Sequence, residues 1–399
     1  MMKHLFPVIC LLVLASCSKD DDSDTYQAPA ERTVVVYMAG ENNLTSYIQG
    51  DLDEMITGFR QVTNNENLVV FVDKASTTVK PFIAKVTKDP DHPLDTLHRY
   101  EQDFYSSAPA AMADVLNLAV TLCPATRDYG LVLWGHACGW VFADSVPNSR
   151  RAFGFDSGNN TAIGADYENG KWLNIPSMRE ALDWTGIKWK YIFADCCNMS
   201  SIEVAYELRN NTDYLISSPA EIPGNGAPYI TVVPDLFLNT ETFYQNIIDD
   251  YAAAYPNKIP LAAIKTEKVS DLAGATARIL PTVSTFLESV DLSKTIYYYD
   301  YKSLKMLDMN EIIHMALAGD DANYQAWRNV FDQVVVAQKS GYKWSTVHSI
   351  NFSSFTMDNY GGVNMYFPLK KYNTTNYKYN ELIKKLSWYY AVGWPSVGW

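Results

Sequence analysis

Short apolar runs rich in β-branched residues alternate with helical patterns through the first two thirds of the chain, and this alternation most constrains the fold. The runs predict buried strands, and apolar residues at helical spacing predict helices between them. Apolar strands alternating with helices indicate an α/β fold with a mostly parallel sheet covered by helices on both faces. The predicted strands span 33–40, 67–74, 128–136, 188–195, 212–218 and 259–265, and the predicted helices span 108–123, 175–184 and 200–210.

The pattern changes after residue 265, where amphipathic helices dominate. Residues 267–290 and 309–319 predict helices, residues 364–369 predict a late strand, and residues 379–394 predict a closing helix. We therefore expect one α/β domain over 32–265 and a mainly helical C-terminal region over 266–399.

The N-terminus carries an export signal. Met1 to Lys3 is positively charged, and the apolar run after it is too short to span a bilayer. The run ends in "LASC", which resembles the bacterial lipobox, in which the cysteine, here Cys17, is acylated. Residues 18–24 form an acidic run that resembles the surface-export signal of lipoproteins in the Bacteroidetes. The alternative is an ordinary cleaved signal peptide with a chance cysteine.

These features predict a signal peptide over 1–17 and a polar linker over 18–31. The mature protein would be an outer membrane lipoprotein, at the cell surface or facing the periplasm, with its membrane contact through the lipid on Cys17. The formal charge of -13 gives no general attraction to nucleic acid.

Cysteine and histidine spacing argues against a metal centre or a redox pair. No CxxC or HxxxH spacing occurs, and the six histidines lie far apart. Adjacent cysteines rarely bridge each other, so Cys196 and Cys197 are a weak candidate for a thiol oxidoreductase. We expect no metal ligands and no required cofactor.

Two predicted strands end in reactive side chains. His136 follows the third strand in a glycine-flanked turn, and Asp195, Cys196 and Cys197 follow the fourth strand. Neighbouring parallel strands would bring these two ends together at the edge of the sheet where such folds place their chemistry. Each signal alone is weak, because a lone histidine beside glycine is usually structural and a cysteine after a strand is usually a small buried hydrophobe.

The combination is suited to nucleophilic catalysis. A cysteine at the start of the helix predicted near Ser200 would lie at the positive end of the helix dipole, and a nearby imidazole would favour the thiolate further. The histidine could then protonate a leaving amine. Backbone amides from Gly135 to Ala137, or from the turn at Cys197, could stabilise the oxyanion.

The chain resembles the clostripain family of cysteine peptidases, relatives of the caspases, gingipains and legumain. The resemblance runs over most of the mature chain. It is carried, in order, by "YMAGENNL", "LVLWGHACGW", "RAFGFD", "LNIPSMREAL", "FADCCNMSSIEVAYEL", "DYLISSPAEIPGNGAPY" and "GGVNMYFP". The histidine and cysteine motifs are similar to the family's "WNHGGGW" and "FDACLMASLEVAYEL". A caspase-like fold is what this resemblance implies.

Carried over by position, the resemblance implies that His136 is the general acid/base and Cys197 the nucleophile. Cys196 takes the place of the family's alanine and would be a bystander. Family members cleave after Arg or Lys, and Asp195 matches the acidic residue that lines the specificity pocket. The alternative for Asp195 is a helix N-cap at the exit of the strand.

Several positions depart from the family pattern. Ala137 replaces the glycine after the histidine, although an oxyanion role for its amide needs no side chain. "SSPAEIPGNG" replaces the acidic "SEETEPG" and keeps Glu221, while Asn225 stands where some relatives carry a second pocket acid. Basic specificity is therefore less firmly implied than peptidase activity.

Family members are often zymogens cut between the histidine and cysteine segments. Arg150 and Arg151 lie in such a segment, and we expect self-cleavage after one of them, with Arg151 favoured. The processed chains could stay associated. Some relatives use calcium, but no EF-hand-like run occurs here.

The sequence therefore predicts an endopeptidase acting on peptides or proteins that contain Arg or Lys. The competing prediction is an inactive surface lipoprotein that binds peptide or another ligand in the same cleft.

Overall fold

The computed structural model describes residues 29–142, 152–158, 170–301, 304–341, 343–345, 352–354, 358–373 and 378–399. Cys17, Arg150 and Arg151 lie outside the described residues, so the predicted lipidation and processing sites stay predictions.

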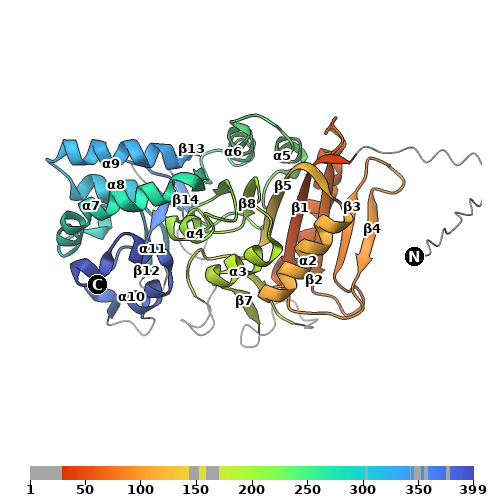
Figure 1. Cartoon of the computed structure of the whole chain (residues 1–399), viewed down its shortest axis with the longest axis horizontal. Coiled ribbons are helices and arrows are strands. Elements are labelled where there is room, and N and C mark those ends of the chain that lie inside the picture. The colour runs from red at the N-terminus through yellow and green to blue at the C-terminus, as the bar shows by residue number, and fades with distance from the viewer. Residues whose placement is uncertain are drawn as a thin grey trace, which may run out of the picture.

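A nine-stranded mixed sheet forms the centre of the described part of the chain (Figure 1). Its strands are β1 (Ala30–Gly40), β2 (Asn67–Lys74), β3 (Phe82–Val86), β4 (Leu94–Arg99), β5 (Ala125–Gly135), β8 (Tyr191–Asp195), β9 (Tyr214–Ser217), β10 (Leu261–Lys265) and β13 (Val335–Lys339). Their order is β13-β10-β9-β8-β5-β1-β2-β3-β4. The five central strands from β9 to β2 are parallel, and both edges are antiparallel.

Helices cover both faces of the sheet, which confirms the predicted caspase-like α/β architecture. Alternate residues of β1 enter two separate cores, with Val34 and Val36 in one and Val35 and Tyr37 in the other. The first core also takes up α1 (Ile48–Phe59), α5 (Tyr229–Leu236) and α6 (Phe243–Ala254). The second takes up α2 (Pro109–Leu122), α3 (Ile175–Thr185) and α4 (Ile202–Glu207).

The C-terminal region lies beside the β8–β13 half of the sheet, on the left of Figure 1. Its helices are α7 (Val269–Leu287), α8 (Met309–Ala316), α9 (Asp321–Val334), α10 (Tyr379–Leu382) and α11 (Ser387–Ala391). Its strands besides β13 are β11 (Tyr297–Tyr301), β12 (Leu304–Asp308), β14 (Lys343–Ser345), β15 (Phe352–Ser354) and β16 (Asn364–Met365). The sequence indicated only the last of these strands.

The short 3-10 helices are η1 (Asn43–Ser46), η3 (Thr266–Lys268), η4 (Leu292–Lys294), η5 (Lys370–Asn373), η6 (Ile383–Lys385) and η7 (Trp394–Val397). Among the described residues, no helix has both the length and the apolar character needed to cross a membrane.

The C-terminal region is joined to the central domain behind the end of β8. Residue Asn364 donates its backbone N–H to the Ser200 carbonyl at 3.0 Å, and the Ser200 hydroxyl donates to the Gly362 carbonyl at 3.0 Å. Strand β13 also pairs with β10 in the main sheet. The chain after residue 265 therefore helps to build the sheet and to support the turn that follows β8.

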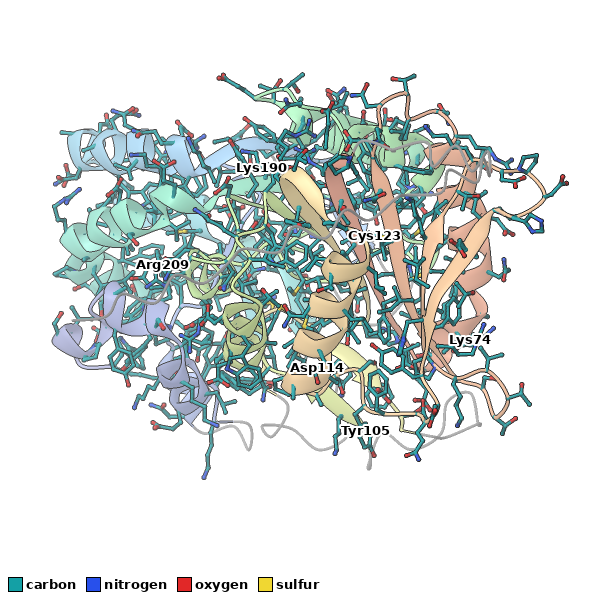
Figure 2. All side chains as sticks on the ribbon, turned by 45° about the vertical axis from the view of Figure 1, so that its right-hand side comes forward. Lys74, Tyr105, Asp114, Cys123, Lys190 and Arg209 are labelled. Carbon is teal, nitrogen blue, oxygen red and sulfur yellow. The ribbon has the colours of Figure 1, made fainter. Side chains whose placement is uncertain are left out.

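The carboxyl ends of the parallel strands share one edge of the sheet. In Figure 2, Lys74 at the end of β2 lies on the lower side, whereas Cys123 and Lys190, which precede β5 and β8, lie on the upper side. A hairpin of β6 (Phe153–Asp156) and β7 (Lys171–Leu173) adds to the carboxyl edge. The predicted reactive residues His136 and Cys197 both follow strands that end at this edge.

Candidate active site

The turns after β5 and β8 meet at one cavity, as the sequence predicts. The two strands pair in parallel with Trp134 opposite Asp195, so His136 and Cys197 each follow that matched pair by two residues. A cavity of about 220 Å³ opens there. It is lined by Asn43, Leu44, Tyr47, Trp134, Gly135, His136, Asp195, Cys197, Ile222, Pro223, Gly224 and Gly226.

His136 is held by the segment after β1 and by β6. Its Nε2 lies 2.7 Å from Oδ1 of Asn43, and its carbonyl accepts the N–H of Gly154 at 2.8 Å. Since an amide oxygen only accepts hydrogen bonds, the Asn43 orientation assigns the proton to Nε2. In the neutral ring Nδ1 then carries the lone pair, so Nδ1 is the basic nitrogen.

The two adjacent cysteines have different surroundings. Cys196 is completely buried in the core, and burial raises the pKa of its thiol well above the usual range. The sulfur of Cys197 borders the cavity and accepts the N–H of Ile222 at 3.4 Å. A donor aimed at sulfur favours the thiolate, so only Cys197 has both access and an environment for nucleophilic chemistry.

The helix predicted near Ser200 is confirmed, but Cys197 does not lie in its first turn, contrary to the expectation from the sequence. Helix α4 begins at Ile202 with Ser201 as its N-cap, five residues beyond Cys197. The intervening turn includes Asn198 in the left-handed region, at φ 61°, with its N–H bonded to the Ala220 carbonyl. Because the dipole effect fades within one helical turn, α4 does not supply the activation that we expected for the thiol.

Asp195 lies at the bottom of the cavity and is hydrogen-bonded by the protein. Its Oδ2 accepts the Ala227 N–H at 2.9 Å and the Tyr229 hydroxyl at 2.7 Å, and its Oδ1 accepts the Tyr251 hydroxyl at 2.9 Å. Burial raises the pKa of Asp195, and these three donors oppose that shift. The alternative role of helix N-cap is wrong, because α4 begins seven residues later.

Gly226 allows the loop after β9 to close over Asp195. Its φ is +60°, and a Cβ at this position would lie 2.5 Å from Asp195 Oδ2. Any side chain would therefore displace the carboxylate or the loop.

A second acid, Asp51 of α1, lies near Asp195. Its Oδ2 accepts the Trp134 indole N–H at 2.6 Å. Burial, followed by the charge of Asp195, raises the pKa of Asp51 to about 8. Asp51 is therefore a mostly neutral acid at pH 7, and its charge near Asp195 develops only as the pH rises through about 8.

The remaining predicted residues are placed unevenly. Gly135 lines the cavity. Ala137 forms an isolated β-bridge with Phe153, through backbone hydrogen bonds of the residues that flank each of them. Glu221 accepts the Ser345 hydroxyl at 3.2 Å, and Asn225 is exposed; neither lines the cavity, although residues between them do. The roles of Ala137, Glu221 and Asn225 in substrate binding stay predictions.

Sequence reasoning missed three contacts of the site. Asn43 follows β1 in the "GENNL" segment, and its polar character at a strand end was the available signal. Tyr229 and Tyr251 come from α5 and α6, and no local pattern connects them to Asp195.

Comparison with known proteins identifies the class to which the fold and this site belong. The sequence model of the clostripain family of peptidases matches residues 36–399. The chain therefore belongs to the clostripain family, and it is a cysteine peptidase.

Several solved structures are similar to this chain. A secreted cysteine protease of the same family from Bacteroides thetaiotaomicron, in complex with an irreversible peptide inhibitor, is 29% identical, with a TM-score of 0.78 over 92% of this chain and 100% of that one. An inactive zymogen from Parabacteroides distasonis is 24% identical, with a TM-score of 0.76 over 92% of this chain and 99% of that one. No curated protein sequence matches the chain.

Proposed function

We propose that this peptidase is an endopeptidase that cleaves after Arg or Lys, with Cys197 as nucleophile and His136 as general acid/base. The observation that carries the proposal is the position of both side chains on one cavity with a buried carboxylate, Asp195, in its floor. The similar protease from Bacteroides thetaiotaomicron, bound to a peptide inhibitor, supports peptide binding in this cleft.

The chemistry follows from these positions. The Cys197 thiolate attacks the carbonyl of the scissile bond, and the His136 imidazolium gives its proton to the leaving amine. Water, deprotonated by the imidazole, then hydrolyses the thioester and regenerates the thiol. Backbone N–H groups of the His136 turn stabilise the oxyanion. The substrate's cationic side chain pairs with Asp195, whose three hydrogen-bond donors oppose the rise in pKa that burial causes.

Peptide cleavage tests the proposal directly. Fluorogenic peptides with Arg, Lys or the neutral isostere citrulline before the scissile bond should separate charge recognition from size. We expect cleavage of Arg and Lys peptides, loss on thiol alkylation, and a loss of at least about 10³-fold in Cys197→Ala. Cys196→Ala is the matched control and should retain most activity, because its sulfur is buried away from the cavity.

The outcomes distinguish the competing functions. Equal cleavage of citrulline and Arg peptides would refute basic specificity while leaving the nucleophile in place. A processed chain that cleaves none of these peptides, but binds them in the cleft, would support the inactive peptide-binding lipoprotein.

Self-processing belongs to the same proposal. We expect the chain to cut itself after Arg150 or Arg151, and mass spectrometry of the fragments identifies the bond. The double variant Arg150→Ala/Arg151→Ala should stay intact. If Cys197→Ala protein in pure solution is cut as fast as the wild type, self-processing is refuted.

Export as a lipoprotein is tested separately. Incorporation of a palmitate analogue and recovery in the outer membrane fraction should both be lost in Cys17→Ser. A Cys17→Ser protein that still carries lipid would overturn the lipobox assignment, without bearing on catalysis.

A further inference from the structure

The sulfur of Cys197 lies where two segments of the chain meet. One is the turn after β8, residues 197–201, which we call the cysteine turn, and the other is the loop after β9, residues 218–222, which we call the facing loop. Ile222 of the facing loop donates its backbone N–H to the sulfur at 3.4 Å. Because a hydrogen bond to sulfur favours the thiolate, the separation of the two segments influences the reactivity of Cys197.

Two backbone hydrogen bonds hold the cysteine turn against the facing loop. Asn198 donates its N–H to the Ala220 carbonyl, and Ser200 donates its N–H to the Ser218 carbonyl, both at 2.9 Å. Together with the contact to sulfur, they form a short ladder that begins at the cavity. The carbonyls of Ser200 and Pro219 take no donor from either segment, so they depend on a third one.

Asn364 of β16, in the C-terminal region, supplies the donors that these carbonyls need. Its Nδ2 donates to the Ser200 carbonyl at 3.1 Å and to the Pro219 carbonyl at 3.4 Å. Its backbone N–H donates to the Ser200 carbonyl at 3.0 Å. On its other side, β16 pairs with β12. The Asn364 side chain therefore spans the two segments from a fixed support.

The other end of the Asn364 amide is unfavourable for the fold. The residue has an exposed fraction of 0%, and its Oδ1 has no hydrogen-bond partner among the described residues. An unpaired buried acceptor lowers stability. Reversing the amide would place Oδ1 against two carbonyl oxygens, so the orientation is determined by the donors. An asparagine held at this cost indicates a role for its Nδ2 beyond packing.

We propose that Asn364 is a positioning residue for catalysis. It fixes the separation of the cysteine turn and the facing loop, and it thereby keeps the Ile222 N–H directed at the Cys197 sulfur. The inference rests on the proposed role of Cys197 as nucleophile. Since α4 begins five residues beyond Cys197, the helix does not take over the task of this N–H. Asn364 does not line the cavity, so it acts through the facing loop.

The pH dependence of thiol alkylation measures this effect without a cleaved peptide. The full chain carries Cys196→Ala, so that one thiol remains in the labelled peptide, and it reacts with iodoacetamide over about pH 5 to 9. Mass spectrometry gives the rate of modification of Cys197. Asn364→Leu keeps the approximate side-chain volume and removes both Nδ2 contacts. We expect the midpoint of the profile to rise by about one pH unit, with about 10-fold slower alkylation at pH 6.

Peptide kinetics and melting separate positioning from folding. Asn364→Leu should lower kcat by about 10-fold with little change in KM, because the substrate pocket is left in place. Its melting temperature should change by only about a few degrees, since the variant loses the unpaired Oδ1 but leaves the Pro219 carbonyl unpaired. Asn364→Ser, whose short hydroxyl can serve one carbonyl, should shift the alkylation midpoint by less than Asn364→Leu.

Asn380 provides the matched control, because it is another buried asparagine of the C-terminal region. Its Nδ2 donates to the Leu369 carbonyl at 3.0 Å and to Oδ1 of Asn373 at 2.6 Å, and neither acceptor belongs to the cysteine turn or the facing loop. Asn380→Leu should lower the melting temperature and leave the alkylation midpoint unchanged.

Three results would overturn the proposal. The first is an alkylation midpoint that stays in place in Asn364→Leu, whether or not peptides are cleaved. The second is an equal shift in Asn380→Leu, which would trace the change to a weakened fold. The third is failure of both Asn364→Leu and Asn364→Ser to fold, which would make Asn364 a residue of the fold alone. If the midpoint moves as expected but the parent chain cleaves no peptide, the proposed endopeptidase function fails and the positioning of the thiol stands.

Discussion

Two buried aspartates at one edge of the central sheet are treated in opposite ways. Asp195 at the end of β8 receives three hydrogen bonds, from one backbone amide and two tyrosine hydroxyls. Asp73 near the end of β2 receives none from the described residues. Burial raises the pKa of both carboxyls, three hydrogen-bond donors oppose the shift at Asp195, and the charge of Asp156 adds to the shift at Asp73.

The difference separates two uses of a buried acid. A carboxylate that the protein already solvates can keep its charge beside an open cavity and wait for a transient cation, such as a substrate side chain. A carboxylate without donors in a closed cluster, such as Asp73 forms with Glu41 and Asp156, requires a permanent partner or a proton. We therefore expect the end of β8, with Asp195, to determine substrate specificity (the Asp195 end). We expect the end of β2, with Asp73, to determine the stability of the fold (the Asp73 end).

The largest expected effect tests this division. Asp195→Asn removes the charge from the cavity and should lower kcat/KM for Arg and Lys peptides by about 10²- to 10³-fold, the usual loss for a buried charge pair. Cleavage of citrulline peptides should change much less. Asp73→Asn, measured at a temperature well below unfolding, is the comparison and should not alter the ratio of Arg to citrulline cleavage. If both variants alter that ratio equally, the two ends do not differ in function.

The donors to Asp195 provide a smaller and more specific test. Tyr251→Phe removes the only described donor to Oδ1, so the pKa of Asp195 should rise further. Because the ionised form binds the substrate cation, the acidic limb of the kcat/KM profile should move to higher pH, with about a 10-fold loss at pH 6. Tyr255→Phe is the matched control, since its hydroxyl donates to the Gly226 carbonyl. An acidic limb that stays in place would show that Tyr251 does not sustain the charge.

The sequence predicts the Asp195 end well because its residues follow two neighbouring apolar strands. "LVLWGH" and "YIFADCC" identify both strand ends, and parallel pairing then brings His136 and Cys197 together. The turn after β8 was harder to predict, because "NMSSIEV" is compatible with a helix starting anywhere from Ser200. The left-handed Asn198 and the hydrogen bond from Asn364 set the actual start.

The Asp73 end could not be recognised from the sequence. Glu41, Asp73 and Asp156 come from three separate segments, and nothing local distinguishes them from acids that end strands elsewhere. The edge strands β3 and β4 were missed for a related reason, since "LDTLHR" is partly exposed and lacks an apolar run. β13 continues the helical pattern of α9, so only its pairing with β10 reveals it.

Asn43 positions the His136 ring, and its substitution should have a moderate effect. Asn43→Ala removes the acceptor for the Nε2–H of His136, which frees the ring to rotate. We expect kcat to fall by about 10-fold with little change in KM, the size of one lost hydrogen bond to a positioned group. Asn43→Asp keeps an acceptor and adds charge, so it should preserve kcat and move the basic limb of the pH profile upward. A change confined to KM would show that Asn43 contacts substrate instead.

The smallest expected effect concerns stability near the Asp195 end. The folded pKa of Asp51 is about 8, well above that of an unfolded aspartate, so the folded state binds more protons. Stability contributed by the neutral carboxyl is complete below about pH 4 and is lost as the pH rises through about 8. In the Cys197→Ala background, Asp51→Asn should therefore raise the melting temperature by a few degrees at pH 8 and much less at pH 5.

Asp53→Asn, on the exposed side of the same helix, is the control and should leave the pH dependence of the melting temperature unchanged. If Asp51→Asn lowers the melting temperature at pH 8, the Asp51 carboxylate is held by a favourable interaction, and burial does not raise its pKa as we infer.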